Sequence, residues 1–343
     1  MNAVPASSAS SASSATVVRP AIAAAGMSKS YGDTTVLDGI DLTVPEGTVF
    51  ALLGPNGAGK TTTVQILSTL IAPTAGEARI AGHDLVREAG AVRSVIGVTG
   101  QFSAVDNLLT AEENLLLMAD LHHLDRREGR RRATALLSRF ELAESTAKPV
   151  ATYSGGMRRK LDLAMTLMGR PRVIFLDEPT TGLDPRSRRI MWEIIRGLVV
   201  DDGVTILLTT QYLEEADQLA DRIALLDHGR IVAEGTAEEL KRRIPGGHVR
   251  LRFADAAQLA RAASLFGSVA TGHPDNLTLN VPSDGGITTL RAVLDTLDAA
   301  SLGAEALTVH TPDLDDVFLA LTGRPQLTSP PTSPLTSPKG QAR

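Results

Sequence analysis

One segment of the chain has glycines, a lysine and a threonine at a spacing suited to binding phosphate. Gly54-Pro55-Asn56-Gly57-Ala58-Gly59-Lys60-Thr61 matches G-x-x-x-x-G-K-[ST] and lies between an apolar run at 49–53 and a helical run at 62–70. Glycines let backbone N–H groups converge on phosphate oxygens, and the helix N-terminus adds a favourable dipole. We expect Lys60 to neutralise the β- and γ-phosphates, Thr61 to ligate Mg²⁺, and Thr62 to complete the phosphate-binding set.

Two carboxylates follow another apolar run. Residues 173–176 are apolar, and Asp177 and Glu178 come directly after them, as expected of a buried strand that ends in two acids. Phosphate ligands bind at that edge of open α/β sheets. Because successive strand side chains alternate, we expect Asp177 to hold Mg²⁺ through water and Glu178 to face the attacking water as a general base.

The elements that would position these residues lie in a first block, residues 22–244. Helical stretches alternate there with apolar runs, which predicts α/β layering. The runs are 49–53, 95–99, 173–176, 204–209 and 223–226. The last three are nearly continuous in apolar residues, as in strands buried on both faces.

A second block, residues 248–324, has a different pattern. Strand-like segments at 248–253, 268–272, 276–281 and 304–311 and helical stretches at 255–266 and 287–299 give the order βαββαβ. This order predicts a small α+β ferredoxin-like domain, with Asp255 as a helix N-cap and Pro245-Gly246-Gly247 as the linker before it. Residues 1–21 are rich in Ser and Ala, residues 325–343 repeat Thr-Ser-Pro, and we expect both to be disordered.

Composition excludes several classes of function. The 343 residues include no cysteine, which rules out disulfide scaffolds, thiolate metal sites and cysteine nucleophiles. The formal charge of −5 argues against a globally basic protein, and we expect no nucleic-acid partner. We also expect no membrane-spanning helix and no secretory signal.

Further segments, in register with these motifs, resemble the nucleotide-binding domain of ABC transporters. Tyr153-Ser154-Gly155-Gly156-Met157 looks like the signature of that family, and the likeness spans about residues 25–244. Segments 152–159, 209–217, 227–230 and 314–323 narrow it to the daunorubicin-resistance type of ATP-binding subunit.

The resemblance implies roles for four more residues. Tyr31 corresponds to the aromatic residue that stacks on adenine, and Gln101 to the residue near Mg²⁺ and the water. Asp184 falls in the D-loop at the dimer face, and Gln211 takes the position of the switch histidine.

The resemblance also implies the fold, the cofactors and the partners. It predicts a P-loop NTPase fold of the ABC type with a helical subdomain at about 102–160, which binds ATP and Mg²⁺. Two copies would sandwich ATP, with Ser154, Gly155 and Gly156 of one copy facing Lys60 of the other. A separate integral membrane permease would hold the chain at the cytoplasmic face of the membrane, to export a hydrophobic drug or antibiotic.

Other functions stay open on the sequence. A soluble ABC ATPase that acts on ribosomes or DNA, an importer subunit, and a lipid or polysaccharide exporter are the alternatives. Two interpretations are also open for the residues at 102–117, among them Val105, Leu108 and Leu109, which could receive the permease or belong to the core. The basic residues 158–160, like the arginines near 186–189, could be a solvated face or could face nucleotide.

The switch position generates a first prediction. A glutamine amide can donate to the γ-phosphate, but it cannot be protonated as a histidine can. We expect Gln211→His to raise the steady-state rate of ATP hydrolysis modestly. An unchanged or reduced rate would indicate that the pocket is built around the amide.

Overall fold

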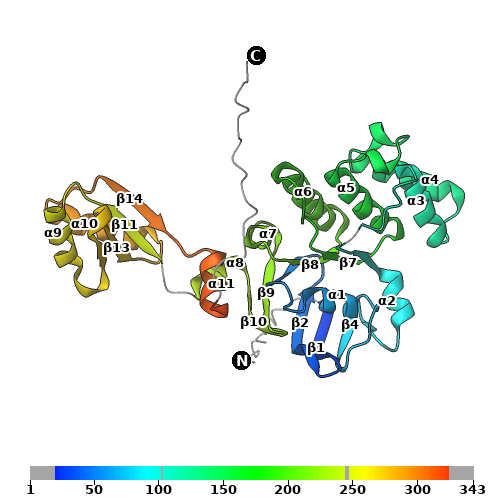
Figure 1. The fold of residues 1–343 in the computed structure, drawn as a ribbon, viewed down its shortest axis with the longest axis horizontal. Helices are drawn as coiled ribbons and strands as arrows, with labels where there is room; N and C mark the ends of the chain where they lie inside the picture. Colours follow the sequence, from blue (N-terminus) through cyan, green and yellow to red (C-terminus); the bar gives the residue numbers. More distant parts are fainter. Residues whose placement is uncertain (1–19, 102, 244–246, 324–343) are drawn as a thin grey trace, which may run out of the picture.

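The structure is a computed structural model that describes residues 20–101, 103–243 and 247–323. Figure 1 shows a body built around the central strands and a separate lobe that carries β11, β13 and β14. The segments at 1–21 and 325–343 that were predicted to be disordered, and the predicted linker at 245–247, lie largely outside the described residues. We call residues 1–21 the leader. Only Pro20 and Ala21 of the leader are described, and both belong to the first strand.

A six-stranded sheet forms the centre of the body, in the order β10-β9-β3-β8-β7-β6. Its strands are β3 (Val49–Leu53), β6 (Ile96–Thr99), β7 (Val173–Asp177), β8 (Thr205–Thr210), β9 (Arg222–Asp227) and β10 (Arg230–Gly235). All neighbours are parallel except β10, which pairs antiparallel with β9. Every residue of β7 and β8 is buried, so the continuous apolar runs are strands covered on both faces, as predicted.

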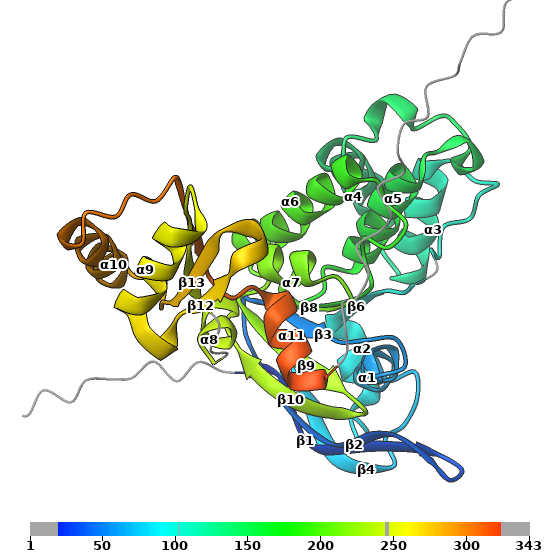
Figure 2. The same cartoon turned by 60° about the vertical axis from the view of Figure 1, so that its left-hand side comes forward.

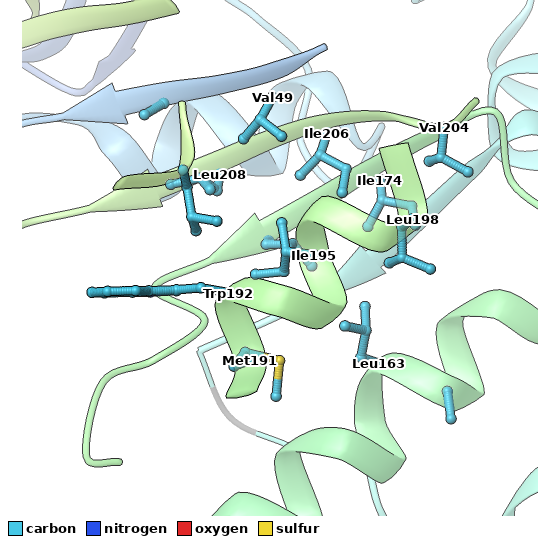
Figure 3. Close-up of a cluster of buried hydrophobic side chains, with 14 of the residues drawn as sticks. Val49, Leu163, Ile174, Met191, Trp192, Ile195, Leu198, Val204, Ile206 and Leu208 are labelled. Carbon is cyan, nitrogen blue, oxygen red and sulfur yellow. The ribbon is translucent and has the colours of Figure 1, made fainter. Parts of the chain in front are cut away.

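Alternate residues of β3 face two different cores. Val49, Ala51 and Leu53 pack in the core that contains α5, α6 and α7, whereas Phe50 and Leu52 pack in the core that contains α1 and α2. These helices are α1 (Lys60–Leu67), α2 (Ala89–Val95), α5 (Gly155–Thr166), α6 (Pro185–Asp202) and α7 (Leu213–Leu219). Figure 3 shows part of the first core, where α6 lies against the strands.

A four-stranded antiparallel sheet covers the second core and was not predicted from the sequence. Its order is β2-β1-β4-β5. The strands are β1 (Pro20–Tyr31), β2 (Thr34–Pro45), β4 (Ala75–Ile80) and β5 (His83–Asp84). Tyr31 is the last residue of β1, so this sheet determines where the expected adenine contact lies.

A helical region lies between β6 and β7. It contains α3 (Ala111–Leu121), α4 (Arg126–Arg139) and α5, with 3-10 turns at Ala143–Ser145, Val150–Thr152 and Leu167–Gly169. Helix α5 begins directly after Ser154, whose hydroxyl accepts a hydrogen bond from the Met157 N–H and caps the helix.

The lobe follows α8 (Ala237–Arg242) and has the predicted order of strands and helices. Its elements are β11 (His248–Arg252), α9 (Ala256–Phe266), β12 (Thr271–His273), β13 (Thr278–Pro282), α10 (Ile287–Ala299) and β14 (Ala306–His310). The sheet is antiparallel in the order β12-β13-β11-β14. Asp255 caps α9 as predicted. The prediction that Leu277 lies in a strand is wrong, because its φ of +53° ends a 3-10 turn at Pro274–Asn276.

The last described helix, α11 (Leu314–Thr322), lies against the body rather than in the lobe. Leu314, Val317 and Phe318 belong to the same buried core as Leu219 of α7 and Leu240 of α8. Figures 1 and 2 both show α11 beside α8, apart from α9 and α10. The lobe is therefore attached to the body at both of its ends.

None of the helices in the described part of the chain is long and apolar enough to cross a membrane.

The attachment of α11 generates a stability prediction. Phe318 is 1% exposed, so Phe318→Ala removes a buried ring and should lower the free energy of unfolding of the body by about 3–5 kcal/mol. Leu319 is 38% exposed, and Leu319→Ala should cost about 1 kcal/mol or less. Calorimetry of the two variants measures the difference. Equal effects would contradict the packing of α11 on the body.

Candidate functional site

The glycine-rich loop joins β3 to α1 at the carboxyl edge of the central sheet. The Gly54 N–H donates to the Thr210 carbonyl at 3.2 Å, which anchors the loop to the neighbouring strand β8. A Cβ at Gly54 would lie 2.2 Å from the Leu226 carbonyl oxygen, and one at Gly59 would lie 2.5 Å from Leu37 Cδ2. Gly59 also has a φ of +109°. Only glycine fits these two positions, so the loop backbone stays close to the sheet.

Lys60 is the buried cation of the loop. Its side chain is 4% exposed, and its Nζ donates to the carbonyls of Gly54 at 2.8 Å and Pro55 at 3.1 Å. Glu178 Oε1 lies 3.7 Å from the same Nζ. Burial lowers the pKa of Lys60, and the charges of Glu178 and Asp177 oppose that shift. A triphosphate on the loop would add further negative charge beside this buried ammonium group.

Asp177 lies at the end of β7 and faces the start of α1. Its buried Oδ1 accepts hydrogen bonds from Thr209 Oγ1 at 2.5 Å and from Thr61 Oγ1 at 3.3 Å. A carboxylate and a hydroxyl oxygen are the hard donors that Mg²⁺ prefers. Residues from β7, β8 and α1 thus meet at one point, and the expected metal-binding pair is in contact.

Glu178 is held in a backbone conformation that is uncommon for a side-chain-bearing residue. Its φ is +49°, and its N–H donates to the carbonyl and the hydroxyl of Thr209 at 3.2 and 3.0 Å. Left-handed backbone outside glycine costs free energy and persists where the surroundings fix it. The Thr181 hydroxyl donates to Glu178 Oε2 at 3.2 Å, which leaves Oε1 towards Lys60.

Arg159 on α5 joins the signature helix to both carboxylates through their backbone. Its guanidinium group donates to four carbonyls, those of Gly100, Asp177, Glu178 and Pro179, at 2.8–3.4 Å. Its Nη1 also lies 3.3 Å from the Asp162 carboxylate. Burial lowers the pKa of Arg159, while Asp162 and Asp177 oppose that shift. Neither interpretation of the basic cluster holds for Arg159, because it is neither solvated nor directed to nucleotide.

The other two basic residues of that cluster also have partners within the chain. Arg158 donates to the Tyr153 carbonyl through Nε at 3.2 Å and Nη2 at 3.1 Å. Lys160 Nζ lies 2.8 Å from Glu141 Oε2. These two residues therefore connect parts of the helical region to each other.

The signature residues lie at the exposed N-terminus of α5, next to the D-loop. Ser154 and Gly155 are exposed, and a Cβ at Gly156 would lie 2.9 Å from Ser187 Oγ on α6. Asp184 caps α6 by accepting hydrogen bonds from the N–H groups of Arg186 and Ser187, both at 3.0 Å. Its oxygens are thus directed to its own helix.

Three other predicted residues lie around this centre. Tyr31 is 50% exposed, and Lys29 Nζ lies 5.0 Å from its ring centroid. Gln101 is exposed after β6, and Gln211 is half-buried between β8 and α7. Within the described ranges, no hydrogen bond joins Tyr31, Gln101, Gln211 or Ser154 to the glycine-rich loop. Within one chain, the loop, Asp177 and Glu178 are therefore in contact. The other predicted residues named here form no hydrogen bond with the loop in the described part of the chain.

Thr209, which binds both Asp177 and the Glu178 backbone, was not predicted from the sequence. A threonine at the end of an otherwise apolar run was the available signal, because a buried hydroxyl needs a partner.

A sequence model of the family described as ABC transporter matches residues 37–181. The daunorubicin resistance ATP-binding protein DrrA3 of Streptomyces coeruleorubidus is 51% identical over 304 residues, which cover 88% of this chain and 96% of that protein. The daunorubicin/doxorubicin resistance ATP-binding protein DrrA of Streptomyces peucetius is 47% identical over 309 residues, which cover 89% and 93%.

A solved structure is also similar. It is the dimeric structure of an ATP-binding cassette in a post-hydrolysis state, bound to ADP and phosphate. The TM-score is 0.57 at 27% identity, and the match covers 63% of this chain and 98% of that one.

The contacts of Arg159 generate a prediction about stability. Arg159→Met removes the cation that faces the buried Asp162 carboxylate and the donor to four backbone carbonyls, and it should lower the free energy of unfolding by about 3–5 kcal/mol. Lys160→Met removes only an ion pair with the exposed Glu141 and should cost less than about 1 kcal/mol. Urea unfolding of both variants provides the comparison. A similar small cost for both would show that Arg159 has no structural role.

Proposed function

The chain belongs to the ABC transporter ATP-binding proteins, and on that premise we propose that it drives export of an anthracycline-like drug through a separate membrane permease. As a member of this family it hydrolyses ATP. The observation that carries the assignment of the site is the buried Lys60, which lies between loop carbonyls and Glu178. The relatives named above are described by resistance to daunorubicin and doxorubicin, which supports the choice of drug.

ATP would bind on the glycine-rich loop. The backbone N–H groups at 56–57 and 59–62 and the Lys60 ammonium would balance the charge of the phosphates. Tyr31 would stack on adenine, and its half-exposed ring leaves a face available. Thr61, Asp177 and Gln101 would hold Mg²⁺, which neutralises phosphate charge when bound. The contact between Thr61 and Asp177 supports this set.

Glu178 would act as the general base towards the attacking water. Its Oε1 lies 3.7 Å from the Lys60 ammonium, so the carboxylate stands beside the phosphate-binding loop, where it would accept a proton from the water. Gln211 would donate its amide N–H to the γ-phosphate from the other side. The catalysis then depends on positioning and on charge, as is usual for phosphoryl transfer.

A second copy of the chain would complete each site. Ser154, Gly155 and Gly156 lie at the exposed start of α5, where N–H groups and the helix dipole favour an anion. In our proposal they contact the γ-phosphate bound by the partner copy, with Asp184 near the dimer face. The similar cassette of known structure is dimeric, which supports the arrangement.

The permease would dock near the helical region at the cytoplasmic face of the membrane. Leu108 is 88% exposed after Gln101, whereas Val105 is buried in the core. Val105 is therefore part of the core, and in our proposal Leu108 contacts the permease. We also propose that the lobe is a ferredoxin-like domain, since two βαβ units interleave in its antiparallel sheet.

An affinity capture tests this function. Tagged Glu178→Gln chain should retain ATP but hydrolyse it slowly, which would hold the complex closed in solubilised membranes with ATP and Mg²⁺. Mass spectrometry should find a near-stoichiometric membrane protein with several spans. Glu178→Gln combined with Lys60→Met, which should not bind ATP in the closed state, is the control. Recovery of only ribosomes, nucleic acid or soluble proteins would contradict the transporter function.

A further inference from the structure

A buried carboxylate with no part in the chemistry above lies between the two segments on either side of the site. Glu215 on α7 is 0% exposed, and it comes four residues after Gln211. Its Oε1 accepts hydrogen bonds from Thr180 Oγ1 at 2.7 Å and from Trp192 Nε1 at 3.2 Å. Thr180 comes two residues after Glu178, and Trp192 lies on α6. One oxygen atom therefore joins the loop after β7, α6 and α7.

Stability alone does not account for an acid at this position. Glu215 Oε2 is buried and has no hydrogen-bond partner within the described part of the chain. Burial raises the pKa of the Glu215 carboxyl, and hydrogen bonds from neighbouring hydroxyls and the indole oppose that shift. An apolar side chain of similar size would avoid the cost of burying this group. The carboxylate therefore has to be explained by what its oxygen holds in place.

A second contact joins the same elements next to Gln211. The Arg188 guanidinium on α6 lies over the ring of Tyr212, at 4.8 Å from its centroid. The Tyr212 N–H donates to Thr210 Oγ1 at 2.9 Å, which ties the Gln211 segment to the end of β8. Arg188 is itself 8% exposed. Helix α6, which begins at the D-loop, thus contacts Tyr212 and Glu215, one and four residues after Gln211.

We propose that Glu215 is a positioning residue for ATP hydrolysis, which couples the loop that carries Glu178 and Asp184 to the segment that carries Gln211. This inference rests on the proposed roles of Glu178 and Gln211. A movement of the D-loop at the dimer face displaces Thr180 and is transmitted through Glu215 to α7. The general base and the γ-phosphate contact are then set together.

The coupling acts through the acceptor oxygen rather than through charge. Glu215→Gln keeps a side-chain oxygen that can accept the hydrogen bonds from Thr180 and Trp192. Glu215→Leu removes the acceptor at similar volume, and Thr180→Val removes only the hydroxyl from the loop. Asp217→Asn is the matched control, because Asp217 lies on the same helix, is a third exposed and pairs with Lys241 of α8.

Steady-state hydrolysis by the purified full-length chain tests the proposal. Glu215→Leu should lower kcat by about 10-fold or more with KM for ATP within about twofold, because the loop that binds phosphate is intact. Thr180→Val should lower kcat in the same direction. Glu215→Gln should stay within about threefold of the original chain, and Asp217→Asn should match it.

The chain offers a second measurement that reports on this position. Trp192 is its single tryptophan, and its indole N–H donates to Glu215 Oε1. ATP with Mg²⁺ should shift the emission of Trp192 in the original chain and in Glu215→Gln. The shift should be lost in Thr180→Val, where the loop is no longer joined to the carboxylate.

The outcomes separate this proposal from the one it rests on. If the original chain hydrolyses ATP and Thr180→Val changes neither kcat nor the emission shift, the coupling is refuted and the proposed function stands. Equal losses in Glu215→Gln and Glu215→Leu would refute the role of the acceptor oxygen. If Glu178→Gln hydrolyses ATP as fast as the original chain, the proposed role of Glu178 as general base is refuted, and with it the basis of this inference. Should Glu215→Leu not fold, Thr180→Val decides alone.

Discussion

A desolvated ammonium group is the constraint on which the rest of the site depends. Lys60 Nζ is removed from water and is held by two loop carbonyls and by Glu178 at 3.7 Å. Since burial disfavours a cation, the loop must direct its carbonyls inward and stay close to the sheet. Gly54 and Gly59 meet that requirement, because a Cβ at either position would meet atoms of the sheet or of Leu37. The same charge makes the loop a place where a polyphosphate is favoured.

The contacts around that cation also explain why the proposed site needs two copies. Within one chain, Thr61 donates a hydrogen bond to Asp177 and Lys60 forms an ion pair with Glu178, whereas the signature at Ser154 is exposed. Arg159 fixes the signature helix to the backbone of both carboxylates. The signature residues that a chain presents to its partner are therefore fixed in position relative to Asp177 and Glu178 of the same chain.

Much of this architecture could be predicted from the sequence, because the chemistry and the buried strands leave local patterns. The loop motif, the acids after β7 and the continuous apolar runs depend on neighbours in the chain. The roles of Arg159, Thr209 and Glu215 could not be predicted, because their partners are set by tertiary contacts between distant segments. The sheet of β1, β2, β4 and β5 was missed for a similar reason. The site of α11 was missed too, since its apolar face fits either the lobe or the body.

The central claim is that ATP joins two copies through Lys60 of one and Ser154 of the other. Sedimentation velocity of the Glu178→Gln chain, with and without ATP and Mg²⁺, tests it most directly. We predict a monomer without nucleotide, a dimer with ATP, and a monomer under both conditions when Ser154→Arg is added. A dimer that forms regardless of ATP or of Ser154→Arg would contradict the claim, as would a monomer under every condition.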